Sequence, residues 1–233
     1  MRYFKLLNKS SKYLFICLII TSCKPNFDIL ELELNQTKIN DIVNRNIELE
    51  DESMGGKTFK ITSSEKMLII NNLHLKNQNL DSTRSNHLWI EYDKKDSIIN
   101  AYQLVYYTQI GDPKVVFEKL KERMGEPDFR HFPIYSHSFE ESEPNNFDAA
   151  LWEDKENKIF YMLQYTLWDD TIRELRLYAL NNNELNLEDP TFHIKPFYFW
   201  KDYLDAREEM DKPNFTYQEF RKNQGGKYRD FTK

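Results

Sequence analysis

The first 23 residues constrain the folding of this chain more than any other segment. Residues 1–12 carry four basic side chains and no acid, residues 13–20 are largely apolar, and two small residues precede Cys23. A basic stretch, a short apolar run and small residues are typical of a secretory signal. The apolar run is about half the ~20 residues that a membrane-crossing helix needs. The mature fold is therefore expected to begin after this segment.

The end of this segment, residues 20–23 (Ile-Thr-Ser-Cys), resembles the lipobox of bacterial lipoproteins. The resemblance implies that a signal peptide, residues 1–22, is removed and that Cys23 carries diacylglyceryl and palmitate-type acyl chains. Residues 23–26 would then be a lipidated tether in the cell envelope. Lys24 is not the aspartate that retains some Gram-negative lipoproteins in the inner membrane, which favours the outer membrane. A secretory signal with a chance cysteine is the alternative.

Cysteine content limits how the mature chain can be stabilised. Cys17 lies in the apolar run and would be lost with it, so Cys23 would be the one cysteine left, and it would be lipidated. No intrachain disulfide could then form, and the fold must depend on its core. Loss of four basic residues takes the formal net charge from −6 to about −10. Such an acidic body argues against nucleic acid as a partner.

Short alternating segments separated by turns predict a mainly antiparallel sheet in residues 27–210. The expected strands are 27–34, 58–62, 67–75, 88–92, 97–108, 150–153, 158–168 and 172–180, and the expected helices are 36–48, 113–124 and 197–210. Residues 49–57 and 126–147 are expected to be loops, and residues 211–233 a C-terminal tail. Hairpin-length connections favour an α+β fold, a single domain with one or two helices packed on one face of the sheet.

The helix over 113–124 has the clearest signals. Asp112 can cap its first turn and Pro113 suits the first helical position. An apolar stripe runs through Val116, Leu120 and Met124. Gly125 suits the left-handed residue that follows a helix, so the helix is expected to end there.

Motif searches favour a binding protein over an enzyme. The chain has no phosphate-binding loop, no dinucleotide fingerprint and no compact metal motif. His131 and His137 lie six residues apart in an acidic loop, where imidazole and carboxylate could bind zinc or transfer protons. A solvated loop explains the same residues more simply. No catalytic residue, metal or cofactor is therefore assigned.

The segment Phe197-Tyr198-Phe199-Trp200 is the most unusual in composition. Such aromatic residues are favoured where a protein partner or a membrane interface is met, so Phe197, Tyr198 and Trp200 are candidate partner-binding residues. The alternative is that they cover the sheet and are themselves covered by residues 211–220.

These observations together favour an envelope lipoprotein whose soluble domain binds a protein partner in the periplasm or at the cell surface. One alternative is a lipid-anchored immunity or inhibitor protein that neutralises a basic toxin or hydrolase, because acidic charge would speed that encounter. Another is an envelope hydrolase that uses His131 or His137 with nearby carboxylates.

Overall fold

The described part of the chain has the predicted α+β architecture, built on a large antiparallel sheet. The computed structural model describes residues 26–45, 47–76, 85–109, 113–131, 149–167, 172–181, 195–212, 214–217 and 219–220. In chain order the elements are η1 Ile29–Glu31, α2 Ile39–Val43, β1 Glu50–Met54, β2 Lys57–Thr62, β3 Ile69–Ile70, β4 Leu73–His74, β5 His87–Tyr92, β6 Ile99–Gln109, α3 Pro113–Met124, β7 Phe129–His131, β8 Ala149–Asp154, β9 Ile159–Leu167, β10 Ile172–Asn181 and α4 Lys195–Glu209.

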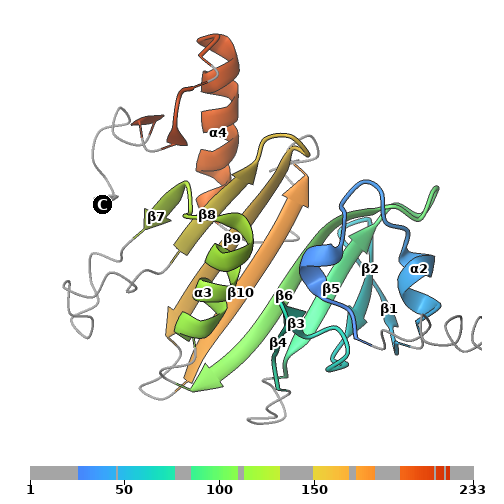
Figure 1. Cartoon of the computed structure of the whole chain (residues 1–233). Coiled ribbons are helices and arrows are strands. Elements are labelled where there is room, and N and C mark those ends of the chain that lie inside the picture. The colour runs from blue at the N-terminus through green and yellow to red at the C-terminus, as the bar shows by residue number, and fades with distance from the viewer. Residues whose placement is uncertain are drawn as a thin grey trace, which may run out of the picture.

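The sheet consists of two halves that mirror each other in strand order. Its order is β1-β2-β5-β6-β10-β9-β8-β7, so the last strand of each half lies at the centre (Figure 1). Each half is a four-stranded antiparallel arrangement followed in the chain by a helix. The two halves join through β6 and β10, which pair over nine residues. This long central pairing makes one continuous sheet from two hairpin-rich segments.

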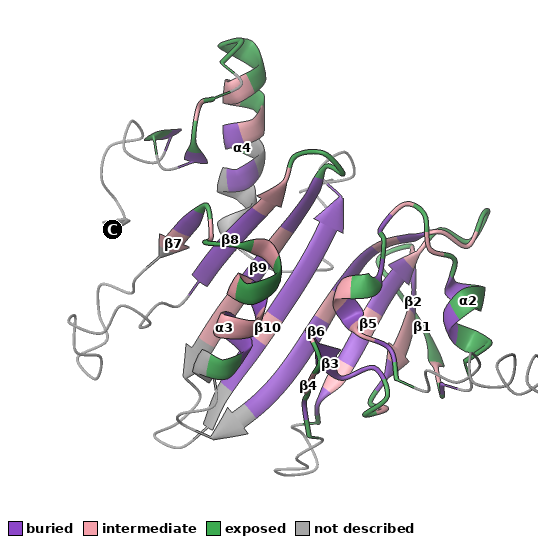
Figure 2. Cartoon of the chain, in the orientation of Figure 1, coloured by how far each residue is buried: buried purple, intermediate pink, exposed green. Residues whose placement is uncertain are grey.

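One face of the sheet is an apolar row that crosses both halves. Leu88, Leu104, Leu177, Leu163 and Ala150 lie opposite one another on successive strands, and all are fully buried. Figure 2 shows that the central strands are buried along most of their length. Since side chains alternate between faces, the intervening residues form a second face.

Helix α3 and the N-terminal segment cover the first face. Val116, Phe117 and Leu120 from α3 belong to the same core cluster as the leucine row. Gly125 follows the helix with φ +84°, as its predicted C-cap role requires. Phe27, Ile29 and other buried residues of the N-terminal segment pack beside α3 on this face (Figure 1).

Helix α4 packs on the opposite face, with a separate aromatic cluster. Trp200 stacks on Phe160, with ring centroids 4.7 Å apart. Tyr217 and Phe220 are buried in the same cluster, so they belong to the folded domain although the predicted domain ended at residue 210. The prediction placed the helices on one face. The structure instead has one long helix on each face, because each apolar stripe needs its own apolar surface.

Several predicted elements differ in detail. Residues 27–34 are not a strand: Asp28 accepts a hydrogen bond from the backbone N–H of Leu30, which begins the single 3₁₀ turn η1. Residues 49–57 are not a loop: β1 and β2 form a hairpin around Gly55 and Gly56, whose φ angles are 60° and 81°. β1 was missed because all five of its residues are exposed, which leaves no apolar alternation.

The predicted strand 67–75 is a tight hairpin instead. Asn71 and Asn72 have positive φ angles and separate β3 from β4. Asparagine tolerates that conformation better than most residues, so the apolar run turns back there. Within the described residues, none of the helices has the length and apolar character needed to cross a bilayer.

Candidate partner-binding site

One candidate site is a groove on the first face, which we call the acidic groove. It has a volume of about 810 Å³ and lies between the N-terminal segment, the end of α3 and the turn that joins β8 to β9. Its lining residues are Leu30, Glu31, Leu32, Glu33, Leu34, Gln36, Arg123, Met124, Asp128, Trp152, Glu153, Asp154, Asn157, Ile159 and Tyr161. The volume falls within the range of small-molecule and peptide sites.

Charge in the acidic groove is strongly negative. Glu31, Glu33, Asp128 and Asp154 line it together with Glu153, and Arg123 is the one cationic residue among the lining residues. Asp154 also accepts two hydrogen bonds from Asn157, so its carboxylate is held in place by the turn. The groove therefore offers several carboxylate oxygens as hydrogen-bond acceptors to a positively charged ligand.

Asp128 is partly shielded from water by its surroundings. Although the residue is exposed overall, loss of water around its carboxyl group raises its pKa above the ordinary value, and the nearby Glu153 charge acts in the same direction. A hydrogen bond from the backbone N–H of Glu153, at 2.8 Å, partly offsets the rise. A cation bound beside Asp128 would therefore stabilise its charged form.

Apolar and aromatic side chains accompany these carboxylates. Trp152 is buried, and its indole N–H donates to the carbonyl oxygen of Gly125 at 3.0 Å, which ties β8 to the end of α3. Tyr161 is half-buried, and burial followed by the charge of Asp154 raises its pKa to about 12. Its hydroxyl therefore stays protonated and can donate a hydrogen bond at neutral pH.

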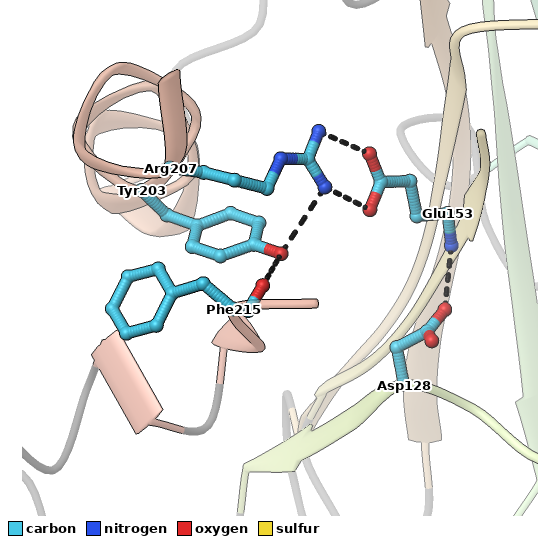
Figure 3. A network of polar contacts seen from close by, with 5 residues as sticks. All are labelled: Asp128, Glu153, Tyr203, Arg207 and Phe215. Atoms are coloured by element: carbon cyan, nitrogen blue, oxygen red, sulfur yellow. Dashed lines mark hydrogen bonds and ion pairs between the residues drawn. The ribbon is translucent and has the colours of Figure 1, made fainter. Parts of the chain in front are cut away.

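A polar network anchors α4, on the opposite face, to Glu153, which also lines the groove (Figure 3). Arg207 donates from both terminal nitrogens to the Glu153 carboxylate, each at 2.8 Å, and from one of them to the Tyr203 hydroxyl at 3.2 Å. Tyr203 in turn donates to the carbonyl oxygen of Phe215 at 2.7 Å. The Glu153 side chain is only 4% exposed. Its charge is thus neutralised within the fold, and Glu153 adds little to the charge a ligand would meet.

A smaller hollow of about 470 Å³ lies where β2 ends and β5 begins. His87 and Trp89 line it with Ile61, and their two rings meet edge to face at 6.0 Å. Burial lowers the pKa of His87, and the charge of Arg176 acts in the same direction. One ring nitrogen lies 2.7 Å from the carbonyl oxygen of Ser85, which partly offsets the fall. Burial therefore favours the neutral form of the His87 ring.

Of the three candidate partner-binding residues, Phe197, Tyr198 and Trp200, the structure describes only the side chain of Trp200. Trp200 is 1% exposed and contacts Phe160, Tyr203 and Tyr217, so it cannot meet a partner at the surface. The alternative prediction, that the aromatic segment covers the sheet and is itself covered by residues 211–220, is confirmed for Trp200. Phe197 and Tyr198 lie in α4, but their side chains are outside the described residues.

The predicted histidine pair cannot be assembled from the described residues. His131 ends β7, where its backbone pairs with Ala149, and its side chain is not described. His137 and Cys23 lie outside the described residues. In the part of the chain that the structure describes, no three His, Cys, Asp or Glu residues are placed to hold a metal ion.

The acidic groove escaped sequence analysis because its lining comes from separate segments. Glu33, Asp128 and Asp154 are far apart in the chain and lie in no shared motif. For the polar network that anchors α4, a local signal was the i, i+4 spacing of Tyr203 and Arg207 on one face of that helix. That spacing predicts neighbouring side chains, but it does not name Glu153 as their partner.

Comparisons with protein-family models, curated proteins and solved structures give no match to this chain.

Proposed function

We propose that this chain is a lipid-anchored lipoprotein of the bacterial envelope that binds a basic segment of a protein partner in the acidic groove. The leader and Cys23 support the anchor. The observation that carries the binding role is the groove itself, where the carboxylates of Glu31, Glu33, Asp128 and Asp154 and the guanidinium of Arg123 line a surface that also contains apolar and aromatic side chains.

Lysine or arginine side chains of a partner fit this chemistry. Their charged ends can pair with Glu31, Glu33 or Asp154, and their aliphatic stems can pack on Met124 and Tyr161. A negatively charged ligand would meet repulsion from every one of those carboxylates. The overall acidic charge of the mature chain would also speed association with a basic protein.

An immunity or inhibitor role is the second candidate, and the same groove favours it. A basic toxin or hydrolase would present lysine and arginine side chains to the carboxylates, and a dedicated inhibitor binds one such protein tightly. The two roles differ in how many partners are bound and how tightly, which the following experiment measures.

Crosslinking in living cells tests the proposal. The chain carries a C-terminal tag, and proteins that copurify after crosslinking are identified by mass spectrometry. Glu31 and Glu33 are both exposed, so the double variant Glu31→Lys/Glu33→Lys reverses groove charge with little effect on folding. We expect one or a few basic proteins with the parent chain, and at least a tenfold lower yield with the variant.

A matched variant separates the groove from general charge. Glu52→Lys/Glu208→Lys makes the same charge change at two exposed residues outside the groove and should retain the partner. Equal loss with both variants would show that net charge, and not the groove, governs binding. A single partner in near-equal amount would favour the immunity role. The absence of any enriched protein would refute the binding proposal.

A further inference from the structure

The smaller hollow at the end of β2 lies on the second face of the sheet, and we call it the aromatic hollow. It has a volume of about 470 Å³, and its lining residues are Glu48, Glu50, Ile61, Thr62, Ser63, Ser64, Ser85, His87 and Trp89. Glu50 pairs with Ile61 and Ile61 with Trp89, so these three residues form one row across β1, β2 and β5. Leu88 and Ile90, on either side of Trp89, belong to the core of the first face. Because side chains alternate along a strand, Trp89 lies on the face opposite to the acidic groove.

Aromatic side chains form one wall of the aromatic hollow. Trp89 is half-buried, so part of its indole ring remains accessible. The fully buried ring of Phe59 meets the Trp89 ring edge to face at 5.7 Å, and the His87 ring meets it edge to face at 6.0 Å. These two contacts hold the indole ring in place. Among aromatic side chains, the face of an indole attracts a cation most strongly.

Two carboxylates lie beside this aromatic wall. Glu48 and Glu50 are both exposed and both line the hollow. Within the described residues, neither carboxylate has an ion-pair partner, and none of the lining residues is a lysine or an arginine. The hollow therefore combines a fixed indole ring with negative charge that no lining side chain neutralises.

Basic side chains on the same face are paired with acids of their own. Lys57 lies on the second face of β2, and its ammonium nitrogen is 3.0 Å from the Glu91 carboxylate. Arg176 pairs with Glu174, whose side chain is 1% exposed. The two exposed residues that follow Ser64 carry opposite charges, so they add no net charge at this end. The charge of the two lining carboxylates is therefore not offset by these neighbours.

The His87 ring adds no positive charge when it is neutral. Its Nδ1 lies 2.7 Å from the carbonyl oxygen of Ser85, and a carbonyl oxygen can only accept a hydrogen bond. Nδ1 therefore carries the proton of this contact. Burial favours the neutral ring, in which Nε2 keeps a lone pair and can accept a hydrogen bond from a ligand.

We propose that the aromatic hollow binds an organic ammonium group. The charge of the ligand would pair with Glu48 and Glu50, and its carbon atoms would pack on Trp89 and Ile61. An anion would be repelled by both carboxylates, and a neutral apolar ligand would remove them from water without compensation. The volume lies in the lower part of the range of small-molecule sites. This site lies on the opposite face from the acidic groove, so it goes beyond the proposed function and does not depend on it.

Isothermal titration calorimetry of the purified full-length protein with choline tests the proposal. The matched neutral probe is dimethylbutanol, in which a carbon atom replaces the quaternary nitrogen of choline and the shape is retained. We expect saturable one-to-one binding of choline and at least about tenfold weaker binding of the neutral alcohol, because the alcohol lacks the charge. Equal affinity for the two probes, or no binding of choline at millimolar concentrations, would overturn the proposal.

Neutral variants locate the binding. Glu48→Gln/Glu50→Gln keeps two exposed side chains of similar size and should weaken choline binding at least about fivefold. Trp89→Leu removes the aromatic ring and should reduce the preference for choline over dimethylbutanol, with circular dichroism to confirm that the chain still folds. Glu31→Gln/Glu33→Gln makes the same charge change in the acidic groove and should leave choline affinity unchanged. Equal losses in the two glutamine variants would show that choline responds to net charge, which would contradict a site in the hollow.

A second ammonium probe distinguishes the possible sources of this group. N-acetyl-lysine amide stands for a lysine side chain of a protein, whereas choline stands for a free small amine. Tighter binding of choline would identify a free amine as the ligand, and tighter binding of the lysine derivative would identify a protein lysine. In both cases the loss on Glu48→Gln/Glu50→Gln must remain if the aromatic hollow is the site.

Discussion

At the scale of single residues, Tyr102 is the described residue whose buried side chain has a polar atom without a hydrogen-bond partner. It is fully buried on β6, and its hydroxyl has no hydrogen-bond partner among the described residues. Burial raises the pKa of Tyr102, and so, in decreasing order, do the charges of Tyr161 and Asp28. The two Asp28 oxygens, however, accept hydrogen bonds from the backbone N–H groups of Leu30 and Asn72. A buried hydroxyl without a partner costs about 1–3 kcal/mol.

Replacement of Tyr102 by phenylalanine should therefore stabilise the domain. Tyr102→Phe removes the unpartnered hydroxyl and keeps the ring, so we expect the free energy of unfolding to rise by about 1 kcal/mol. Urea denaturation followed by circular dichroism measures the change. A fall of more than about 1 kcal/mol would mean that the hydroxyl makes a stabilising hydrogen bond. Tyr92→Phe, at a half-buried tyrosine on β5, is the control and should change stability little.

At the scale of elements, α4 depends on the short segment that follows it. Trp200 and Tyr203 contact Tyr217, and Tyr203 also contacts Phe215 and Phe220. The Arg207–Glu153 ion pair fixes the same helix to β8. Because these aromatic residues cover one another, the helix and the segment should form or unfold together.

Truncation tests that dependence. A chain that stops after residue 214 loses the three aromatic residues that cover α4. Each buried aromatic side chain contributes about 1.5–3 kcal/mol, so we expect a loss of at least about 3 kcal/mol in unfolding free energy. Tryptophan emission should shift to longer wavelength as Trp200 meets water. A chain that stops after Phe220 is the control and should unfold close to the parent. Equal losses in both chains would contradict the proposed role of residues 215–220.

At the scale of the whole molecule, the proposed leader and the folded domain would have separate tasks. The domain needs no disulfide, because its two faces each bury a continuous apolar cluster. The lipid on Cys23 would then serve only to hold the domain at the membrane. Several acyl chains suffice for stable attachment, since each buried methylene contributes about 0.8 kcal/mol.

Substitution of Cys23 tests this division of tasks. Cys23→Ala should leave an uncleaved precursor without lipid, because the modifying enzymes act on the cysteine thiol. Labelling with radioactive palmitate, followed by gel electrophoresis, measures this directly. Ser22→Ala keeps a small residue before the cysteine and should still be labelled. Label entering the Cys23→Ala chain would contradict the lipobox interpretation.

Features that depend on neighbouring residues could be predicted from the sequence. Two hairpins, β5–β6 and β8–β9, follow from alternation interrupted by turn residues, and α3 follows from its apolar stripe with Pro113 and Gly125 at its ends. Alternation also predicted that Leu30, Leu32 and Leu34 share one face; Leu32 and Leu34 are buried and Leu30 is half-buried, although the local backbone is not the predicted strand. Such signals are visible in the chain because each depends on only a few consecutive residues.

The way in which these hairpins and helices combine depends on contacts between distant parts of the chain. The pairing of β6 with β10 joins residues about 70 positions apart and sets the mirrored strand order. An apolar stripe shows that α4 is buried on one side, but it does not show which face of the sheet receives it. The acidic groove likewise exists only where separate segments meet. Charge and cavity shape arise there from contacts between residues distant in sequence, which no local pattern encodes.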